Sequence, residues 1–194
     1  MWLRYAFLNH AWWLGCCLVC HTVGTCRWFV PLTTYYVCGT ACWLTHVAGH
    51  YSWSGAWYKF HTLGHHIRSY PPSKFLQTRY VSFEARRRMT NCNPLFDLNT
   101  LMYSPWVLFT AVIHALCGVN DAGSLSVCLA TGVLFLQQQD YMHTHIHLRG
   151  SWLEQYEWFY HLRHMHLKHH QNDMKHNFGV NDFVLDVIAG TLLL

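Results

Sequence analysis

The sequence predicts an all-α membrane protein with four transmembrane helices in two hairpins and a cytosolic, histidine-rich helical cap. Only 11% of the 194 residues are charged and 52% are apolar, so the chain carries less than half the charge that is usual in a soluble domain. The charges avoid four long stretches, and 14 of the 17 histidines lie outside these stretches. We expect residues 1–194 to form a single domain.

The four charge-free stretches are each close to the length that crosses the hydrocarbon core of a bilayer, which is roughly 20 residues. A short turn around Arg27 joins the first two, and the turn-like sequence VNDAGS joins the last two. A signal peptide is disfavoured because Asn9 and His10 interrupt the first stretch. The predicted spans are residues 5–26, 28–45, 98–120 and 122–139.

The basic residues predict the orientation of these spans. Of the 13 Lys and Arg residues, 12 lie on the side of the two long polar segments and the termini, and Arg27 lies on the other. By the positive-inside rule the histidine-rich segments are cytosolic. We expect the endoplasmic reticulum membrane in a eukaryote, or the inner membrane in a bacterium. The basic run 86–88 favours lipid headgroup contact over nucleic-acid binding, so no nucleic-acid partner is expected.

The nine cysteines do not indicate a disulfide framework. Eight of them fall within or at the ends of the apolar stretches, where Cys behaves as a small hydrophobic residue. The CxxC pair formed by Cys17 and Cys20 lies inside the first predicted span. We therefore predict neither disulfides nor thiolate metal sites.

Four histidine clusters, HVAGH, HTLGHH, HTHIH and HMHLKHH, indicate metal binding. At i, i+3 and i+4 spacing, imidazoles lie on one face of a helix and can converge on an ion. Imidazole suits iron, zinc, copper and nickel, whereas magnesium and calcium prefer oxygen ligands. The clusters begin at His46, His61, His143 and His164.

The isolated histidines are interpreted differently, because a lone histidine is more often a hydrogen-bonded surface or interfacial residue than a ligand. An alternative, in which His21 and His114 bind a haem within the membrane, has no other support in the sequence. The isolated histidines are His10, His21, His114, His161 and His176.

Two segments resemble a known family. Residues 166–191, HLKHHQNDMKHNFGVNDFVLDVIAGT, are similar to the terminal HxxHH box, the NFG stretch and the closing D-x-x-x-G-T of the membrane-bound fatty acid hydroxylase and sterol desaturase superfamily. Residues 140–147, DYMHTHIH, resemble the third box of its fatty acid 2-hydroxylases, the most similar branch. The resemblance covers about residues 46–66 and 140–191.

The resemblance implies a dinuclear iron centre that uses O2 as co-substrate to hydroxylate a C–H bond of a fatty acyl chain, sphingolipid or sterol. Zinc is an alternative occupant in purified protein. His145 and His164 are reserve ligands. Three residues separate His61 from His65, where the family usually has two, so either His61 is not a ligand or its helix is locally distorted. The implied metal ligands are His46, His50, His61, His65, His66, His143, His147, His166, His169 and His170.

Such chemistry needs an external electron donor of the cytochrome b5 or ferredoxin type, since the chain has no haem-attachment, flavin or GxGxxG motif. Asp140, Asp173 and Asn177 are candidates for orienting the imidazoles. Two alternatives stay open. One is a lipid desaturase or a carotenoid or alkane hydroxylase on the same scaffold. The other is a membrane metal transporter, whose histidines would extend through the spans.

Overall fold

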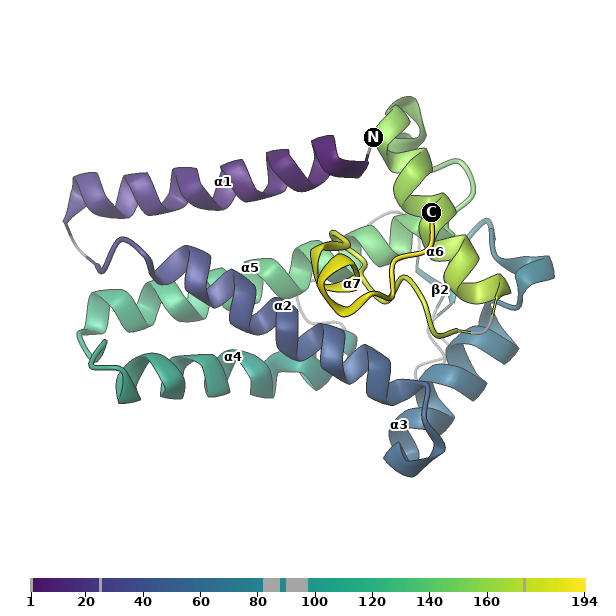
Figure 1. Ribbon diagram of the computed structural model, residues 1–194, viewed down its shortest axis with the longest axis horizontal. Helices are drawn as coiled ribbons and strands as arrows, with labels where there is room; N and C mark the ends of the chain where they lie inside the picture. The colour runs from purple at the N-terminus through teal and green to yellow at the C-terminus, as the bar shows by residue number, and fades with distance from the viewer. Residues whose placement is uncertain (1, 25, 82–87, 90–97, 173) are drawn as a thin grey trace. The chain divides into compact units, whose positions relative to one another are not determined.

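The computed structural model describes residues 2–24, 26–81, 88–89, 98–172 and 174–194, and these residues form an all-α protein (Figure 1). A two-stranded antiparallel pair, β1 (Tyr80–Val81) and β2 (Arg88–Met89), is the exception to the helical structure in this part. The α-helices are α1 (Trp2–Val23), α2 (Val30–Gly49), α3 (Ala56–Tyr58), α4 (Leu98–Leu116), α5 (Ala122–His147), α6 (Glu157–Gln171) and α7 (Val184–Ala189).

Shorter helical elements connect these helices. A π-helix, η2 (Lys59–Ser69), follows α3 directly. Three 3₁₀ turns occupy other connections. They are η1 (Ser52–Ser54), η3 (Pro72–Lys74) and η4 (Trp152–Gln155).

The prediction of an all-α fold is confirmed, but the four transmembrane spans are wrong. Across the described residues, no helix combines the length and the apolarity that crossing a membrane requires. The four longest helices have 19 to 26 residues, which is long enough to cross a bilayer. The property that they lack is therefore apolarity. A segment without charged residues can still contain polar ones, which lower its mean hydropathy. Examples are Asn9 and His10 in α1 and Gln137 and Gln138 in α5. The membrane location and orientation remain predictions.

The chain divides into two compact units, and α2 and α5 contribute residues to both. The histidine unit comprises Met1–Ala6, Trp43–Pro94 and Gln139–Leu194, and the helical unit comprises Phe7–Cys42 and Leu95–Gln138. The prediction of a single functional domain remains a prediction.

The helical unit has a core to which four helices contribute. Trp13 of α1, Tyr35 of α2, Val107 of α4 and Phe135 of α5 are buried together, and such side chains each stabilise a fold by about 1.5–3 kcal/mol. Asn9 is buried beside them, where its amide nitrogen donates to the Tyr35 hydroxyl at 2.7 Å. The polar residues of α1 are therefore part of the packing between helices.

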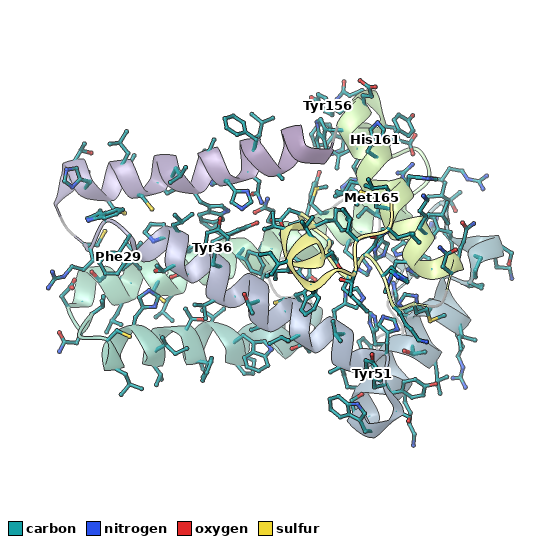
Figure 2. All side chains as sticks on the ribbon, viewed as in Figure 1. Phe29, Tyr36, Tyr51, Tyr156, His161 and Met165 are labelled. Atoms are coloured by element: carbon teal, nitrogen blue, oxygen red, sulfur yellow. The ribbon has the colours of Figure 1, made fainter. Side chains whose placement is uncertain are left out.

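The histidine unit has its own core, built mainly on α5 and α6. Along α6, Phe159, Leu162 and Met165 recur every three residues and are buried, while His161 is exposed. Figure 2 labels His161 and Met165 on this helix. This spacing gives α6 one apolar face that packs against Ile146 of α5. Three histidines of α6 are buried along with that face, which places them in the candidate site.

Candidate metal centre

All ten predicted ligands are brought together in the histidine unit. They come from the end of α2, from η2, from the end of α5 and from α6. In each group of histidines that could hold a metal ion, the candidate ligand atoms lie within 4.8 Å of one another. The first histidine group is His46, His50, His61, His66 and His169, the second is His65, His143, His147 and His166, and the bridging group is His65, His66 and His170.

The nitrogens within the first histidine group are spaced as ligands of one ion would be. His46 Nε2 lies 3.1 Å from His169 Nε2, and His61 Nε2 lies 3.1 Å from His50 Nε2 and 3.2 Å from His66 Nε2. Two nitrogens bound at about 2.1 Å to one ion are about 3.0 to 3.4 Å apart at right-angled or tetrahedral geometry. These separations are compatible with ligands of one metal ion, which the group could hold.

The second histidine group shows the same spacing. His166 Nε2 lies 3.3 Å from His147 Nε2 and 3.2 Å from His170 Nε2. The rings of His65 and His143 approach with their centroids 4.7 Å apart. His170, a member of the bridging group, therefore reaches the second group through His166.

Backbone carbonyls determine which ring nitrogen carries the proton in four of these histidines. A carbonyl oxygen can only accept a hydrogen bond, so the Nδ1 atom that faces it must be protonated and Nε2 is left with a lone pair. The bonds are His46 Nδ1 to Phe178 O at 2.6 Å, His169 Nδ1 to His176 O at 2.7 Å, His170 Nδ1 to Tyr70 O at 2.9 Å and His147 Nδ1 to Phe75 O at 3.1 Å.

The carbonyls that orient the first histidine group and those that orient His147 and His170 thus come from different segments of the chain. The segment that contains His176 and Phe178 serves the first group, and the segment from Tyr70 to Phe75 serves His147 and His170. The facing Nε2 lone pairs of His46 and His169 repel each other unless a cation lies between them.

The imidazoles are neutral at pH 7. Burial lowers the pKa of His46 to about 4 and that of His143 and His170 to about 3. Burial, followed by the neighbouring His46 and His170, lowers the pKa of His50 to about 2. Neutral imidazole is the form that binds metals. Burial, and after it the neighbouring histidines, also holds the pKa of six further imidazoles well below the usual range. They are His61, His65, His66, His147, His166 and His169.

Three ring nitrogens in the site are buried and have no hydrogen-bond partner among the described residues. They are His65 Nε2, His66 Nδ1 and His166 Nδ1. Leaving such groups unsatisfied costs about 1–3 kcal/mol each, so most buried polar atoms in proteins have a partner. A metal ion would satisfy His65 Nε2 when this atom carries the lone pair. If His66 and His166 bind through Nε2, their Nδ1 atoms carry the proton and a metal does not satisfy them.

The helix that carries His61 is distorted, and His61 lies in the first histidine group. Residues 59–69 form a π-helix, in which hydrogen bonds run from i to i+5, as from Tyr70 N to His65 O at 2.8 Å. The wider turn brings His61 and His66, five residues apart, to a separation of 3.2 Å between their Nε2 atoms. The extra residue in HTLGHH is thus absorbed by the backbone, and π-helical segments are frequent at functional sites.

The end of α2 is tied to η2 by polar contacts and a close approach. The Thr62 hydroxyl donates to Gly49 O at 2.7 Å and lies 3.2 Å from His50 Nδ1. Since its one proton goes to Gly49, this hydroxyl accepts from His50, which leaves the lone pair on His50 Nε2. A Cβ atom at Gly49 would lie 2.9 Å from the His61 ring and 2.8 Å from Trp57 Nε1, so the packing requires a glycine.

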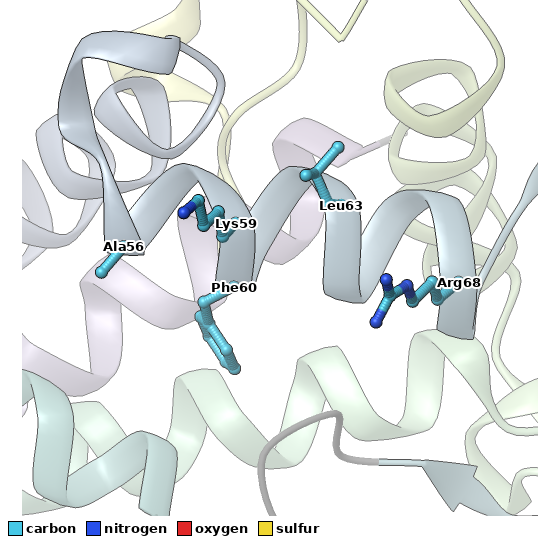
Figure 3. A pocket seen from close by; sticks show the side chains of 5 residues that line it. All are labelled: Ala56, Lys59, Phe60, Leu63 and Arg68. Atoms are coloured by element: carbon cyan, nitrogen blue, oxygen red, sulfur yellow. The ribbon is translucent and has the colours of Figure 1, made fainter.

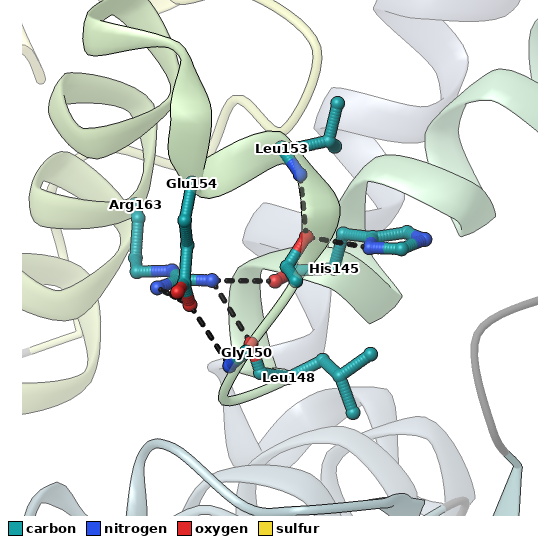
Figure 4. A network of polar contacts seen from close by, with 7 residues as sticks. His145, Leu148, Gly150, Leu153, Glu154 and Arg163 are labelled. Carbon is teal, nitrogen blue, oxygen red and sulfur yellow. Dashed lines mark hydrogen bonds and ion pairs between the residues drawn. The ribbon is translucent and has the colours of Figure 1, made fainter.

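Arg163 joins α6 to the end of α5, where two histidines of the second group lie (Figure 4). Its guanidinium donates to His145 O at 3.0 Å, to Leu148 O at 2.9 Å and to Glu154 Oε1 at 2.7 Å. It therefore caps carbonyls at the end of α5, where His145 O also accepts from Leu148 N at 3.2 Å. This role was not predicted from the sequence. The feature that could have indicated it is a single arginine among the apolar positions of α6 that are buried.

The reserve ligands and isolated histidines lie outside the three groups. His145 is buried, with Nδ1 2.7 Å from the Ser151 hydroxyl, and His164 is exposed on α6. In the helical unit, His21 is exposed. Both ring nitrogens of His114 are hydrogen-bonded, Nε2 to the Thr33 hydroxyl at 2.8 Å and Nδ1 to Thr110 O at 2.9 Å, which leaves neither free for a haem.

Of the three residues expected to orient the imidazoles, Asn177 has other partners, and the expectation for Asp140 and Asp173 stays a prediction. Asn177 donates to Met165 O at 3.0 Å and to Leu193 O at 2.9 Å, so it orders backbone. Asp140 is buried in α5. Asp173 lies outside the described residues. Backbone carbonyls perform the orienting role that we assigned to side chains.

A depression of about 410 Å³ lies beside η2 (Figure 3). Phe60 and Leu63 give it an apolar lining, and Lys59 and Arg68 add two cationic groups. Its volume lies within the range of small-molecule sites. The helix that supplies three histidines to the site therefore also borders a surface suited to an apolar ligand with a negative end.

We predict that Gly49→Ala destabilises the protein and weakens metal binding. The new methyl group displaces the His61 ring, and overpacking costs about 1–3 kcal/mol. Gly39→Ala in the same helix is the control, because its Cβ would make ordinary contacts at 3.8 Å or more and alanine favours a helix by about 1 kcal/mol. Urea unfolding and metal analysis of both variants test this, and equal stability would contradict it.

We also predict that Arg163→Met lowers the free energy of unfolding by about 2–4 kcal/mol, because it removes the donor of Leu148 O and the cation paired with the part-buried Glu154, and leaves His145 O with Leu148 N as its donor. Arg149→Met is the control, since that side chain is exposed at the end of the same segment and surface substitutions usually change stability by less than about 0.5 kcal/mol. Thermal and urea unfolding measure the difference. A loss of similar size in both variants would argue against the capping role.

Comparison with known proteins identified no relatives. No protein-family model matches the chain, and neither a curated protein nor a solved structure was found to be similar to it. The resemblance of residues 46–66 and 140–191 to the fatty acid hydroxylase and sterol desaturase superfamily therefore stays a hypothesis based on sequence motifs. What the structure establishes is a set of buried histidine groups that could hold metal ions.

Proposed function

We propose that the protein is an oxidoreductase that binds two iron ions through its histidines and uses O2 to hydroxylate a C–H bond of a lipid. The observation that carries this proposal is the convergence of neutral imidazoles whose Nε2 atoms approach one another at 3.1–3.3 Å, with a lone pair on both Nε2 atoms in the His46–His169 pair. Such an arrangement is expected to be stable when cations lie between the nitrogens, and the bridging group connects the two places where they would bind.

The ligand set favours a redox-active transition metal. Ten imidazoles shared between two ions provide about five ligands each, which leaves an open position on a six-coordinate ion such as iron. Bound iron would supply the oxidising power for C–H hydroxylation, which no side chain can provide. The overall reaction converts a C–H bond, O2, two electrons and two protons into an alcohol and water. The electrons would come from an external donor of the cytochrome b5 or ferredoxin type.

The protein's own residues would hold the imidazoles and exclude water. Tyr70 stacks on His147 with ring centroids 4.0 Å apart, and Phe75 approaches the same ring at 4.7 Å. Phe178 covers His169 at 5.5 Å. These rings are buried, so they limit the access of water to a reactive centre.

The depression beside η2 supports a lipid as the substrate class. Its apolar lining suits an acyl chain, and Lys59 and Arg68 suit a carboxylate or phosphate head. Lipid analysis of cells with and without expression tests the proposal. We expect a lipid that gains the mass of one oxygen atom. A loss of two hydrogens would instead indicate a desaturase, and an unchanged lipid profile would contradict both.

We predict about two metal ions per chain in iron-loaded protein, and His166→Ala should remove the ion of the second histidine group. Loss of a ligand leaves that site with too few ligands. Even the loss of a group that only orients a ligand lowers metal affinity by about 10- to 100-fold. His164→Ala is the matched control, because His164 lies two residues away on α6 and is exposed. Elemental analysis measures the content. A single ion in the unmodified protein, or equal effects of the two substitutions, would refute the dinuclear assignment.

A further inference from the structure

The C-terminal segment contains a buried carboxylate that the proposed chemistry does not use. Asp186 of α7 is completely buried, and its oxygens accept from Phe178 N at 2.9 Å, Gly179 N at 2.7 Å and the Thr191 hydroxyl at 2.7 Å. No Lys or Arg of the described residues forms an ion pair with it. Burying a carboxylate without a cation is costly, so these three donors have to compensate for its lost hydration.

The backbone that Asp186 holds has little freedom. Asn177 adopts a left-handed conformation, with φ of 56°, and its side chain bonds to Met165 and Leu193. A Cβ atom at Gly179 would overlap the backbone oxygen of Asp182 at 2.0 Å, so a larger residue does not fit. The peptide groups on both sides of Phe178 are therefore fixed in direction.

This fixed backbone contacts His46 of the first histidine group through the Phe178 carbonyl. Phe178 O accepts from His46 Nδ1 at 2.6 Å, while the N–H of the same residue donates to Asp186. The next amide, that of Gly179, belongs to the same peptide group as Phe178 O, and it too donates to Asp186. The carboxylate thus holds the peptide whose oxygen sets the tautomer and direction of the His46 ring.

We propose that Asp186 is a positioning residue for the first histidine group, acting through the Phe178 carbonyl on His46. The effect is selective, because the carbonyls that orient His147 and His170 come from Phe75 and Tyr70, and none of the hydrogen bonds of Asp186 reaches that segment. The inference rests on the metal-binding part of the proposed function and is independent of the lipid substrate.

The test is cobalt(II) titration of Asp186→Asn, followed by visible absorption and competition with a chelator. Asparagine keeps the size of the side chain but replaces one acceptor oxygen with an NH2 group that faces an N–H donor. We expect affinity at one of two sites to fall about 10- to 100-fold, as for other groups that orient metal-binding histidines, and affinity at the other to stay unchanged. Asp182→Asn, in the same segment, is the control and should bind both ions normally.

Paired variants identify the affected site. In a His166→Ala background, where the first group alone is intact, Asp186→Asn should weaken the remaining cobalt site about 10- to 100-fold. In a His50→Ala background, where the second group alone is intact, it should have no effect on affinity. Unfolding of the metal-free variants is measured alongside, so that a general loss of stability is seen separately.

The outcomes separate the two proposals. Weakening confined to the His166→Ala background supports the positioning role. Equal weakening in both backgrounds, or lower stability with unchanged cobalt affinity, overturns it and leaves the dinuclear site in place. Fewer than two cobalt ions in the unmodified protein would overturn the dinuclear site itself and the positioning role with it.

Discussion

Ten imidazoles, eight buried and two half-buried, lie in groups whose candidate ligand atoms are within 4.8 Å of one another. They need a partner for every ring nitrogen, and this requirement explains much of the histidine unit. Burial keeps the rings neutral, so each has one N–H to donate and one lone pair to place. Inward-facing N–H groups would block an ion. The surrounding chain must therefore draw the protons outward, and four backbone carbonyls do so at 2.6–3.1 Å.

A carbonyl can face a histidine ring only where it is not used within a helix, so the backbone at these carbonyls is irregular. Side chains have to hold such backbone in place. Phe178 O is available because residues 177–179 leave regular structure, held by Asn177 and Asp186. Tyr70 O becomes available where η2 ends. At the end of α5 two carbonyls do not face a histidine of the site, and Arg163 donates hydrogen bonds to them. Buried polar side chains outside the histidine groups thus serve the geometry of the site indirectly.

Histidine spacing was sufficient to find the four segments that the structure brings together, because imidazoles on one helix face recur at short intervals, while the ten grouped residues themselves were implied by the resemblance. The long helices were also found, but counting charges alone misjudged their apolarity, as Asn9 and Gln138 illustrate. The orienting groups could not be found, since every residue has a carbonyl and only the fold decides which one faces a ring. Asp186 was visible as part of a motif, yet its contact with the Phe178 peptide depends on tertiary structure.

The π-helix shows why a departure from the expected spacing need not weaken a site. In an α-helix the residues at i and i+4 would share a face, and His61 would align with His65. With i to i+5 bonding, His61 aligns with His66 in the first histidine group. His65, whose ring is at 89° to that of His66, is then free to join the second group. One segment of eleven residues therefore supplies both groups, and its π-helical turn is what allows the neighbouring His65 and His66 to lie in different histidine groups.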